Sequence, residues 1–212
     1  MGQYTKADAM RIISKCAVQY NTHLLGHSLL FLIMDKHKNI SSLEVCFEKR
    51  NFLHLTGLEV DKSVFSGERF FEACIEKKLR FCDFELRDDG TTELKLDILP
   101  YLMTKNLSAN AVGDYNGVGI DLYTEKIAGS VKGCIGFCVD KMTGSFVPNT
   151  VLKKDIRMCT KKPQKRIIAT YRKLTDSESY SEVVYVAKKL DFSALKFPDE
   201  YKDLKSLIHR NH

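Results

Sequence analysis

Three side chains that can do chemistry lie close together in the stretch 50–58. They are Arg50, His54 and Thr56. An imidazole titrates near neutral pH, so His54 can accept or donate a proton beside the Thr56 hydroxyl, with the Arg50 cation nearby. The stretch is therefore a candidate reactive cluster. A buried histidine whose ring is satisfied by a backbone carbonyl fits the same spacing, and both interpretations stay open.

The residues before this stretch indicate how it would be positioned. Apolar side chains alternate with Glu and Cys over Leu43–Lys49, and a period of two is typical of a β-strand, whose successive side chains point to opposite faces. If the extended chain continues, His54 and Thr56 project from one face. Gly57 would then let the chain turn away where a side chain would crowd the site.

The net charge of +6 is concentrated in one segment. Residues 151–173 carry nine basic side chains against Asp155 alone, a balance of +8, which leaves −2 for the remaining chain. Each Lys or Arg that neutralises a phosphate releases counterions, so such a segment favours a nucleic-acid partner. A solvated basic face without a ligand is the competing interpretation.

The composition is typical of a reduced protein without a membrane segment. The chain is 44% hydrophobic, enough for a core, and its seven cysteines are odd in number and scattered, unlike a secreted disulfide framework. The N-terminus has no basic-then-apolar signal pattern, and no apolar run approaches about 18 residues. We expect a cytoplasmic protein that does not contact a membrane.

No motif indicates a metal or a cofactor. Cys134 and Cys138 share a strand face at four-residue spacing, whereas a zinc site would need a tighter pair and a second pair. The run Gly117–Gly119 is too short to cradle phosphates, and the chain has no Walker or dinucleotide fingerprint. We therefore expect neither metal nor cofactor.

Apolar periodicity outlines the elements that would position these residues. A helix is expected over 4–24, with Thr5 as its N-cap. The nearly continuous apolar run 27–35 predicts a strand that is buried on both faces and pairs with Leu43–Lys49 as a hairpin. Further helices are expected within 63–79 and 91–102, the second interrupted or kinked at Pro100.

The second half of the chain has the pattern of strands and turns. Residues 106–119 are expected to form a loop or a hairpin lead-in. Strands are expected over 119–127, 133–140, 145–149, 165–173 and 180–188, the third as a short edge strand and the last two as a hairpin. A surface strap with a short helix is expected over 191–212. We expect one domain over 1–212, with its sheet-and-helix core in 25–190.

One face of the strand 165–173 is basic. Alternation places Arg166, Ile168, Thr170 and Arg172 on this face. If the strand lies beside residues 50–58, these side chains face the same groove as His54. The predicted site depends on that adjacency.

The strings that carry a family resemblance are Asn51–Gly57, Phe70–Phe71, Lys95–Leu96, Ile127–Gly129 and Ile135–Phe137. Together they resemble the fourth phage-associated group of the barnase–EndoU–colicin–RelE (BECR) nuclease superfamily, over about residues 25–190. The resemblance implies an RNase-like α+β domain in which helices flank an antiparallel sheet, acting on RNA without a metal.

The resemblance also implies a chemistry. In such folds the ribose 2′-hydroxyl attacks the adjacent phosphate, which needs a base, an acid and a cation at the phosphate. His54 would be the base or acid, Thr56 would hydrogen-bond a phosphoryl oxygen, and Lys95 would stabilise negative charge. Outside the family-like strings, the residues expected to bind substrate are Arg50, Lys132, Arg166, Thr170 and Arg172.

The expected function is a metal-independent endoribonuclease of phage or mobile-element origin, a toxin or effector silenced by an antitoxin or immunity protein. Two alternatives stay open. One is a non-catalytic nucleic-acid-binding or regulatory module that keeps the basic strand. The other is an ADP-ribosyltransferase-like enzyme in which His54 and Thr56 would grip a nucleotide.

Overall fold

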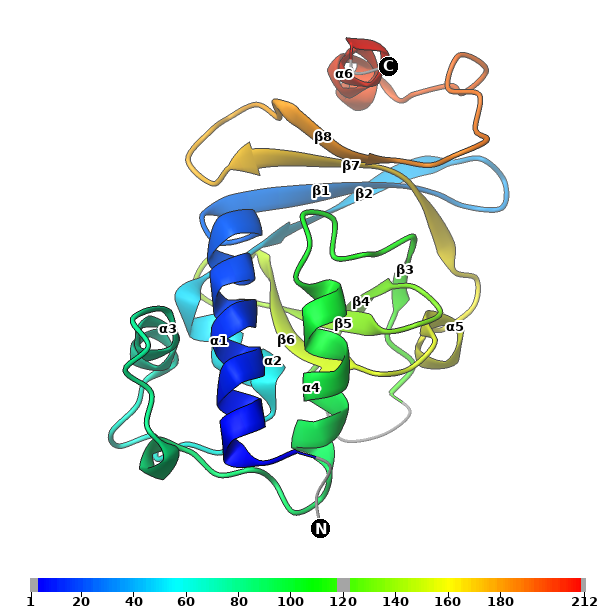
Figure 1. The fold of residues 1–212 in the computed structure, drawn as a ribbon. Coiled ribbons are helices and arrows are strands. Elements are labelled where there is room, and N and C mark those ends of the chain that lie inside the picture. The colour runs from blue at the N-terminus through cyan, green and yellow to red at the C-terminus, as the bar shows by residue number, and fades with distance from the viewer. Residues whose placement is uncertain (1–3, 118–122, 211–212) are drawn as a thin grey trace.

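The computed structural model describes residues 4–117 and 123–210 (Figure 1). Its elements are, in chain order, α1 (Lys6–His23), β1 (His27–Met34), β2 (Ile40–Cys46), η1 (Lys49–Asn51), α2 (Phe52–Thr56), α3 (Gly67–Ile75), η2 (Phe81–Asp83), α4 (Thr91–Leu102), β3 (Ala111–Asp114), β4 (Lys126–Gly129), β5 (Cys134–Val139), β6 (Phe146–Leu152), α5 (Ile156–Cys159), β7 (Lys165–Leu174), β8 (Glu182–Val186), η3 (Asp199–Tyr201) and α6 (Lys202–Arg210). The helices labelled η are of the 3-10 type.

The strands form one mostly antiparallel sheet. Their order within the described residues is β1-β2-β6-β5-β4-β3-β7-β8, and β7 also pairs with β1. This extra pairing closes all strands except β8 into a ring. The contact between β2 and β6 is parallel, through Val45 and Phe146, and the other pairings are antiparallel. The predicted fold class, an α+β domain with helices flanking an antiparallel sheet, is confirmed.

Strand β1 is covered on both faces, as its apolar run predicts. Leu29 and Phe31 belong to the main core beneath the helices, whereas Leu30 and Leu32 belong to a second core. The second core includes Phe192 and side chains of the C-terminal segment, and α6 lies beyond β7 and β8 at the top of Figure 1. A strand that is apolar on both faces needs such cover on each side.

Helix α1 lies along the main core and contacts both α3 and α4. The Thr5 hydroxyl accepts a hydrogen bond from the Asp8 backbone N–H, which confirms the predicted N-cap. Tyr20, near the other end of the helix, is fully buried and donates to the Glu48 carbonyl just before η1. Within residues 4–117 and 123–210, no helix combines the length and apolar character needed to cross a membrane.

Two expectations about the second half of the chain need correction. Strand β6 pairs with β5 on one side and touches β2 on the other, so it is not an edge strand. The segment 106–119, expected as a loop or a hairpin lead-in, contains β3, which pairs antiparallel with the next strand β4 and also with β7. In the expected strand 119–127, residues 119–122 lie outside the described residues and β4 begins only at Lys126. Short strands rich in Gly show too little alternation to be bounded from sequence.

Candidate active site

Residues 50–56 are helical, and the expected extended conformation is wrong. After η1 the chain continues into α2, which ends at Gly57. Successive side chains on a helix are about 100° apart, so His54 and Thr56 point in directions about 160° apart. The two side chains therefore do not share a face, as they would on a strand.

The apolar side chains of α2 determine which way His54 points. Phe52 and Leu55 are fully buried in the main core, where Phe52 packs against the rings of Tyr20 and Phe71. These anchors hold one side of the short helix against α1 and α3. His54 lies on the other side and is exposed.

The C-terminal end of α2 is held by α4. Gly57 adopts the left-handed conformation, with φ of +73°, and its carbonyl accepts a hydrogen bond of 2.7 Å from the Thr92 hydroxyl. Lys95 Nζ donates to the His54 carbonyl at 2.6 Å. Thr56 is fully buried, and its hydroxyl donates to the Leu53 carbonyl. Thr56 and Lys95 thus fix the backbone that carries His54.

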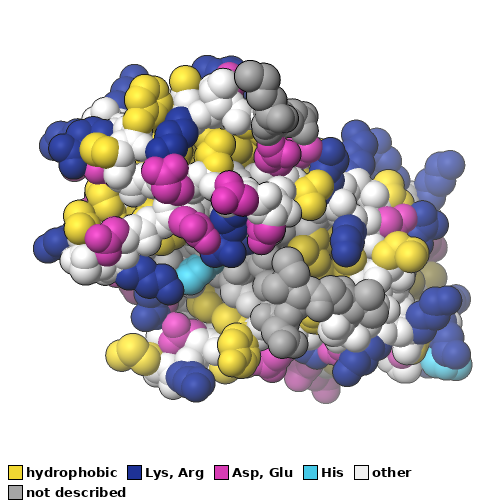
Figure 2. All heavy atoms as spheres, turned by 90° about the horizontal axis from the view of Figure 1, so that it is seen from below, with side chains coloured by type: hydrophobic (Ala, Val, Ile, Leu, Met, Phe, Trp, Pro, Cys, Tyr) yellow, Lys and Arg dark blue, Asp and Glu magenta, His cyan; other side chains and the backbone are white. Residues whose placement is uncertain are grey.

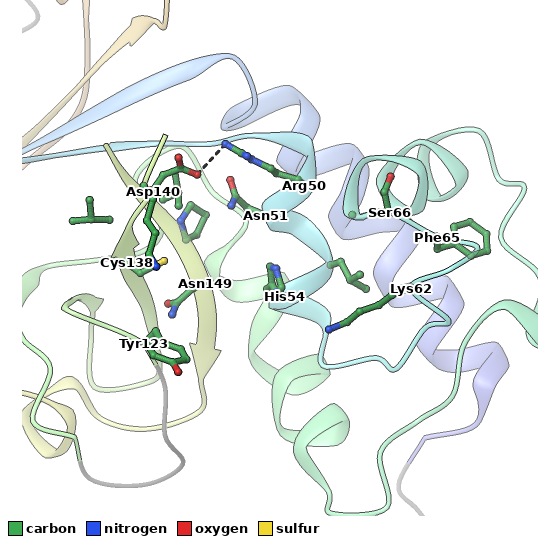
Figure 3. Close-up of a pocket in the computed structure, with 16 residues that line it drawn as sticks. Arg50, Asn51, His54, Lys62, Phe65, Ser66, Tyr123, Cys138, Asp140 and Asn149 are labelled. Carbon is green, nitrogen blue, oxygen red and sulfur yellow. Dashed lines mark hydrogen bonds and ion pairs between the residues drawn. The ribbon is translucent and has the colours of Figure 1, made fainter. Parts of the chain in front are cut away.

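His54 lies in an open groove of about 700 Å³ between α2 and the β5–β6 hairpin. Its charged lining residues are Arg50, Lys62 and Lys141 against Asp140, and its other polar lining residues are Asn51, His54, Ser66, Tyr123 and Asn149. In Figure 3, His54 and the Lys62 ammonium group approach from the α2 side, whereas Asn149 and Tyr123 face them from the other wall. A groove with this excess of cations is suited to an anionic ligand.

The surroundings of His54 favour its neutral form. Partial burial in the groove wall lowers the pKa of the imidazole, and the nearby charges of Lys95 and Lys62 lower this pKa further. Within the described residues the ring has no hydrogen-bond partner of its own. At neutral pH the imidazole is therefore available to accept a proton.

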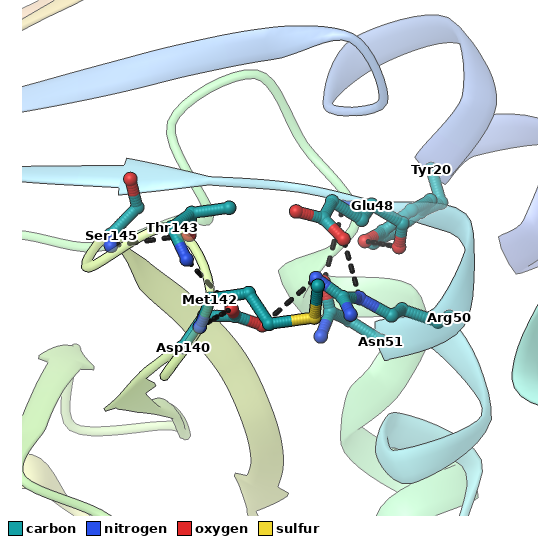
Figure 4. A network of polar contacts seen from close by, with 8 residues as sticks. All are labelled: Tyr20, Glu48, Arg50, Asn51, Asp140, Met142, Thr143 and Ser145. Carbon is teal, nitrogen blue, oxygen red and sulfur yellow. Dashed lines mark hydrogen bonds and ion pairs between the residues drawn. The ribbon is translucent and has the colours of Figure 1, made fainter.

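Arg50 connects the start of α2 to the β5–β6 turn (Figure 4). Its guanidinium donates to Glu48 at 2.5 Å and to Asp140 at 2.9 Å. The Asp140 carboxylate also accepts from the backbone N–H groups of Met142 and Thr143. These backbone hydrogen bonds, followed by the charge of Arg50, lower the Asp140 pKa. The network holds the two walls of the groove together at this end.

The other residues expected to bind substrate do not line the groove. Arg172 pairs with Glu182 and donates to the His23 carbonyl, and Thr170 is fully buried with an unpaired hydroxyl. Arg166 is exposed at the start of β7, and Lys132 lies on the β4–β5 turn over the Tyr101 ring.

The expected adjacency between residues 50–58 and the basic strand is wrong. Strand β7 pairs with β1, β3 and β8 and contributes no residue to the groove. The structure therefore places Arg50 and His54 in the same groove, with Lys95 and Thr56 behind them. The basic strand β7 lies outside this groove.

Sequence reasoning missed most of the opposite wall. Asn149 lies on β6, Asp140 begins the β5–β6 turn, and Tyr123 precedes β4. Lys62 belongs to an irregular segment before α3. Isolated polar residues in turns carry no periodic signal, so only the tertiary structure brings them to His54.

Among residues 4–117 and 123–210, no group of three or more His, Cys, Asp or Glu side chains is arranged to hold a metal ion. Cys138 lines the groove, and burial raises the pKa of its thiol, so the thiolate is disfavoured. Acid–base chemistry at the histidine is what this arrangement can best perform.

The comparisons agree with the resemblance noted in the sequence. A family model described as phage-Barnase-EndoU-ColicinE5/D-RelE like nuclease4 (PBECR4) matches residues 12–189, which is most of the chain. The match includes α2 and both walls of the groove. No curated protein and no solved structure matches the chain significantly.

Proposed function

This chain belongs to the PBECR4 family of phage-Barnase-EndoU-ColicinE5/D-RelE like nucleases, and from that premise we propose that it is a metal-independent endoribonuclease using His54 as its acid–base residue. Family membership indicates a nuclease, which cleaves nucleic acid. The choice of RNA, the independence from metal and the role of the histidine are our proposals.

The observation that carries the proposal is the exposed His54 imidazole, which has a lowered pKa and lies in a groove lined by Arg50, Lys62 and Lys141. The neutral imidazole is the form that accepts a proton, and the lowered pKa keeps His54 in this form at neutral pH. Lys62 and Lys141 would hold the phosphate and stabilise its developing negative charge, whereas Arg50 is already paired with Glu48 and Asp140.

The proposed reaction is a transesterification within the RNA strand. His54 takes the proton of the ribose 2′-hydroxyl, and the 2′-oxygen forms a bond to the adjacent phosphorus. The bond from phosphorus to the 5′-oxygen breaks, and that oxygen takes a proton from water. The products are a 2′,3′-cyclic phosphate and a 5′-hydroxyl. DNA lacks the attacking group and would not react.

Lys95 and Thr56 have supporting roles in this proposal. Lys95 holds the carbonyl of His54 and contributes a charge that lowers the His54 pKa. The buried Thr56 hydroxyl closes the last turn of α2. We propose that both are positioning residues and that neither contacts the phosphate.

A ribonuclease of this kind would be harmful to the cell that makes it. We therefore propose that it acts as a toxin or effector and that a specific antitoxin or immunity protein restrains it. Expression of the wild-type chain should arrest growth, whereas expression of the His54→Ala variant should not.

The test of the activity compares an RNA oligonucleotide with DNA of the same sequence, in buffer containing EDTA. We expect cleavage of the RNA alone, with products that end in a 2′,3′-cyclic phosphate by mass spectrometry. Lys132→Ala, outside the groove, serves as the matched control and should cleave like wild type. Equal cleavage of DNA, or cleavage only after a divalent metal is added, would contradict the proposal. Binding of RNA without cleavage would favour the non-catalytic module.

A further inference from the structure

Tyr123 is unusually exposed for an aromatic residue in a groove. Its relative exposure is 92%, although it lines the wall opposite His54. Val139, at 38% exposed, lines the same groove. A ring as exposed as that of Tyr123 leaves a face open on which a planar ligand can stack.

Asn149 gives this wall a directed hydrogen-bond donor. Its side-chain carbonyl accepts from the Thr124 hydroxyl at 3.1 Å, which orients the amide. The amide NH₂ group has no partner among the described residues and can donate to a ligand. In Figure 3, Asn149 and Tyr123 are neighbours on the wall that faces His54 and Lys62.

We propose that Tyr123 and Asn149 form a subsite for one unpaired nucleobase, which makes a single-stranded nucleic acid the substrate. The base stacks on the Tyr123 ring, and the Asn149 amide donates to a carbonyl oxygen or ring nitrogen on its edge. The backbone phosphate then lies toward His54 and Lys62. A base inside a duplex cannot use this subsite, since both of its faces are covered by its neighbours.

This inference rests on the proposed function, because the phosphate must lie beside His54. The subsite adds selection for unpaired bases, which the groove cations cannot supply, since contacts to phosphates do not read the bases.

The chain contains no tryptophan, which allows a direct optical test. Tyr123→Trp in a His54→Ala background places the only indole at the subsite in a protein that should not cleave its ligand. Leu174→Trp in the same background is the control, since Leu174 is 62% exposed on β7 and does not line the groove. A short single-stranded RNA should quench the indole at position 123 and leave the indole at position 174 unchanged.

Affinity gives the second measurement, by anisotropy of a labelled single-stranded RNA on the His54→Ala protein. Tyr123→Ala should weaken binding about 5- to 150-fold, the range expected for loss of one stacked base. Tyr123→Phe should bind like the parent, because it keeps the ring. The dependence of affinity on salt should not change, since no phosphate contact is removed. A duplex of the same sequence should compete poorly.

The outcomes separate this inference from the proposed function. Salt-dependent RNA binding that is the same in Tyr123→Ala and Tyr123→Phe, without quenching at position 123, would overturn the subsite and leave the nuclease proposal standing. Equal competition by the duplex would overturn it as well. If the parent protein neither binds nor cleaves RNA, both proposals fail together.

Discussion

The His54 imidazole depends on a side chain behind α2 that does not line the groove. Lys95 reaches the His54 carbonyl from behind α2, and burial lowers the pKa of Lys95 to about 8. Most Lys95 side chains are then still protonated at pH 7. This charge favours the neutral imidazole, because an imidazolium beside a cation is destabilised. At the scale of single residues, Lys95 is therefore a tuning group for His54.

Removal of the Lys95 charge should raise the pKa of His54. Lys95→Met keeps an unbranched side chain of similar length, and the imidazole would then hold its proton to a higher pH. The acid limb of kcat/KM should move upward with it, since the neutral base becomes scarcer at a given pH. Titration of the His54 ring by NMR measures the shift directly.

Lys62→Met is the second variant for this measurement, because Lys62 is exposed and its loss should not disturb α2. It should shift the His54 pKa in the same direction. Lys78→Met, three residues beyond the C-terminal end of α3, should leave the His54 pKa unchanged. A His54 pKa that stays constant or falls in both variants would contradict this account of its electrostatics.

At the scale of elements, α2 is too short to form on its own. A five-residue helix lies far below the length at which an isolated helix is stable, about 12 residues. Phe52 and Leu55 hold it against the core, and α4 holds its end through Thr92 and Lys95. These partners are distant in sequence, so no local pattern indicates them.

The length of an element determined whether the sequence could predict it. Long periodic segments such as α1, β1 and the β7–β8 hairpin were predictable, because each repeats its pattern over many residues. Residues 52–56 contain a single turn of helix, and the alternation before them favoured an extended interpretation. His54 and Arg50 were found by residue type. The residues of the opposite groove wall could be identified only from the tertiary structure.

Gly57→Ala should destabilise the protein more than Gly90→Ala. Both glycines have positive φ, +73° and +76°, and an alanine there costs about 1–2 kcal/mol. A Cβ at Gly57 would also lie 2.9 Å from Lys95 Cδ and 3.1 Å from Thr92 Cα, whereas no atom of the described residues lies within 4 Å of a Cβ at Gly90. Crowding of this kind adds about 1–3 kcal/mol.

Urea unfolding of the two variants measures the difference in free energy of unfolding. The free energy of unfolding of Gly57→Ala should be clearly lower than that of Gly90→Ala. Gly57→Ala should also lose activity, because α2 carries His54. Equal stability of the two variants would show that α4 does not clamp the end of α2 as described.

At the scale of the whole molecule, the basic segment 151–173 is partly neutralised. Lys153 pairs with Asp97, Arg157 with Asp155, and Arg172 with Glu182. Lys154, Lys161 and Lys162 are exposed without an ion-pair partner in the described residues. Figure 2 shows Lys and Arg side chains gathered on its right-hand side, the side on which α5 lies in Figure 1. The net charge of a sequence cannot reveal which cations are already paired.

Replacing Lys154, Lys161 and Lys162 together with alanine should weaken RNA binding. If all three contact phosphates, the slope of log affinity against log salt concentration should become shallower by about 2 for a single strand. A control that removes the same charge from exposed positions elsewhere, Lys15, Lys36 and Lys196, should change this slope much less. Equal slopes for the two triple variants would show that the basic segment is a solvated surface that does not contact phosphates.

The kcat/KM of the His54→Ala variant on a single-stranded RNA in EDTA decides whether His54 is the acid–base residue. We predict a loss of about 10²- to 10⁴-fold, the usual contribution of a general acid–base residue. His37→Ala, which removes an exposed histidine from the β1–β2 turn, should retain wild-type activity. Retained RNA cleavage by a folded His54→Ala protein, at the wild-type rate, would contradict the assignment of His54 as the catalytic residue.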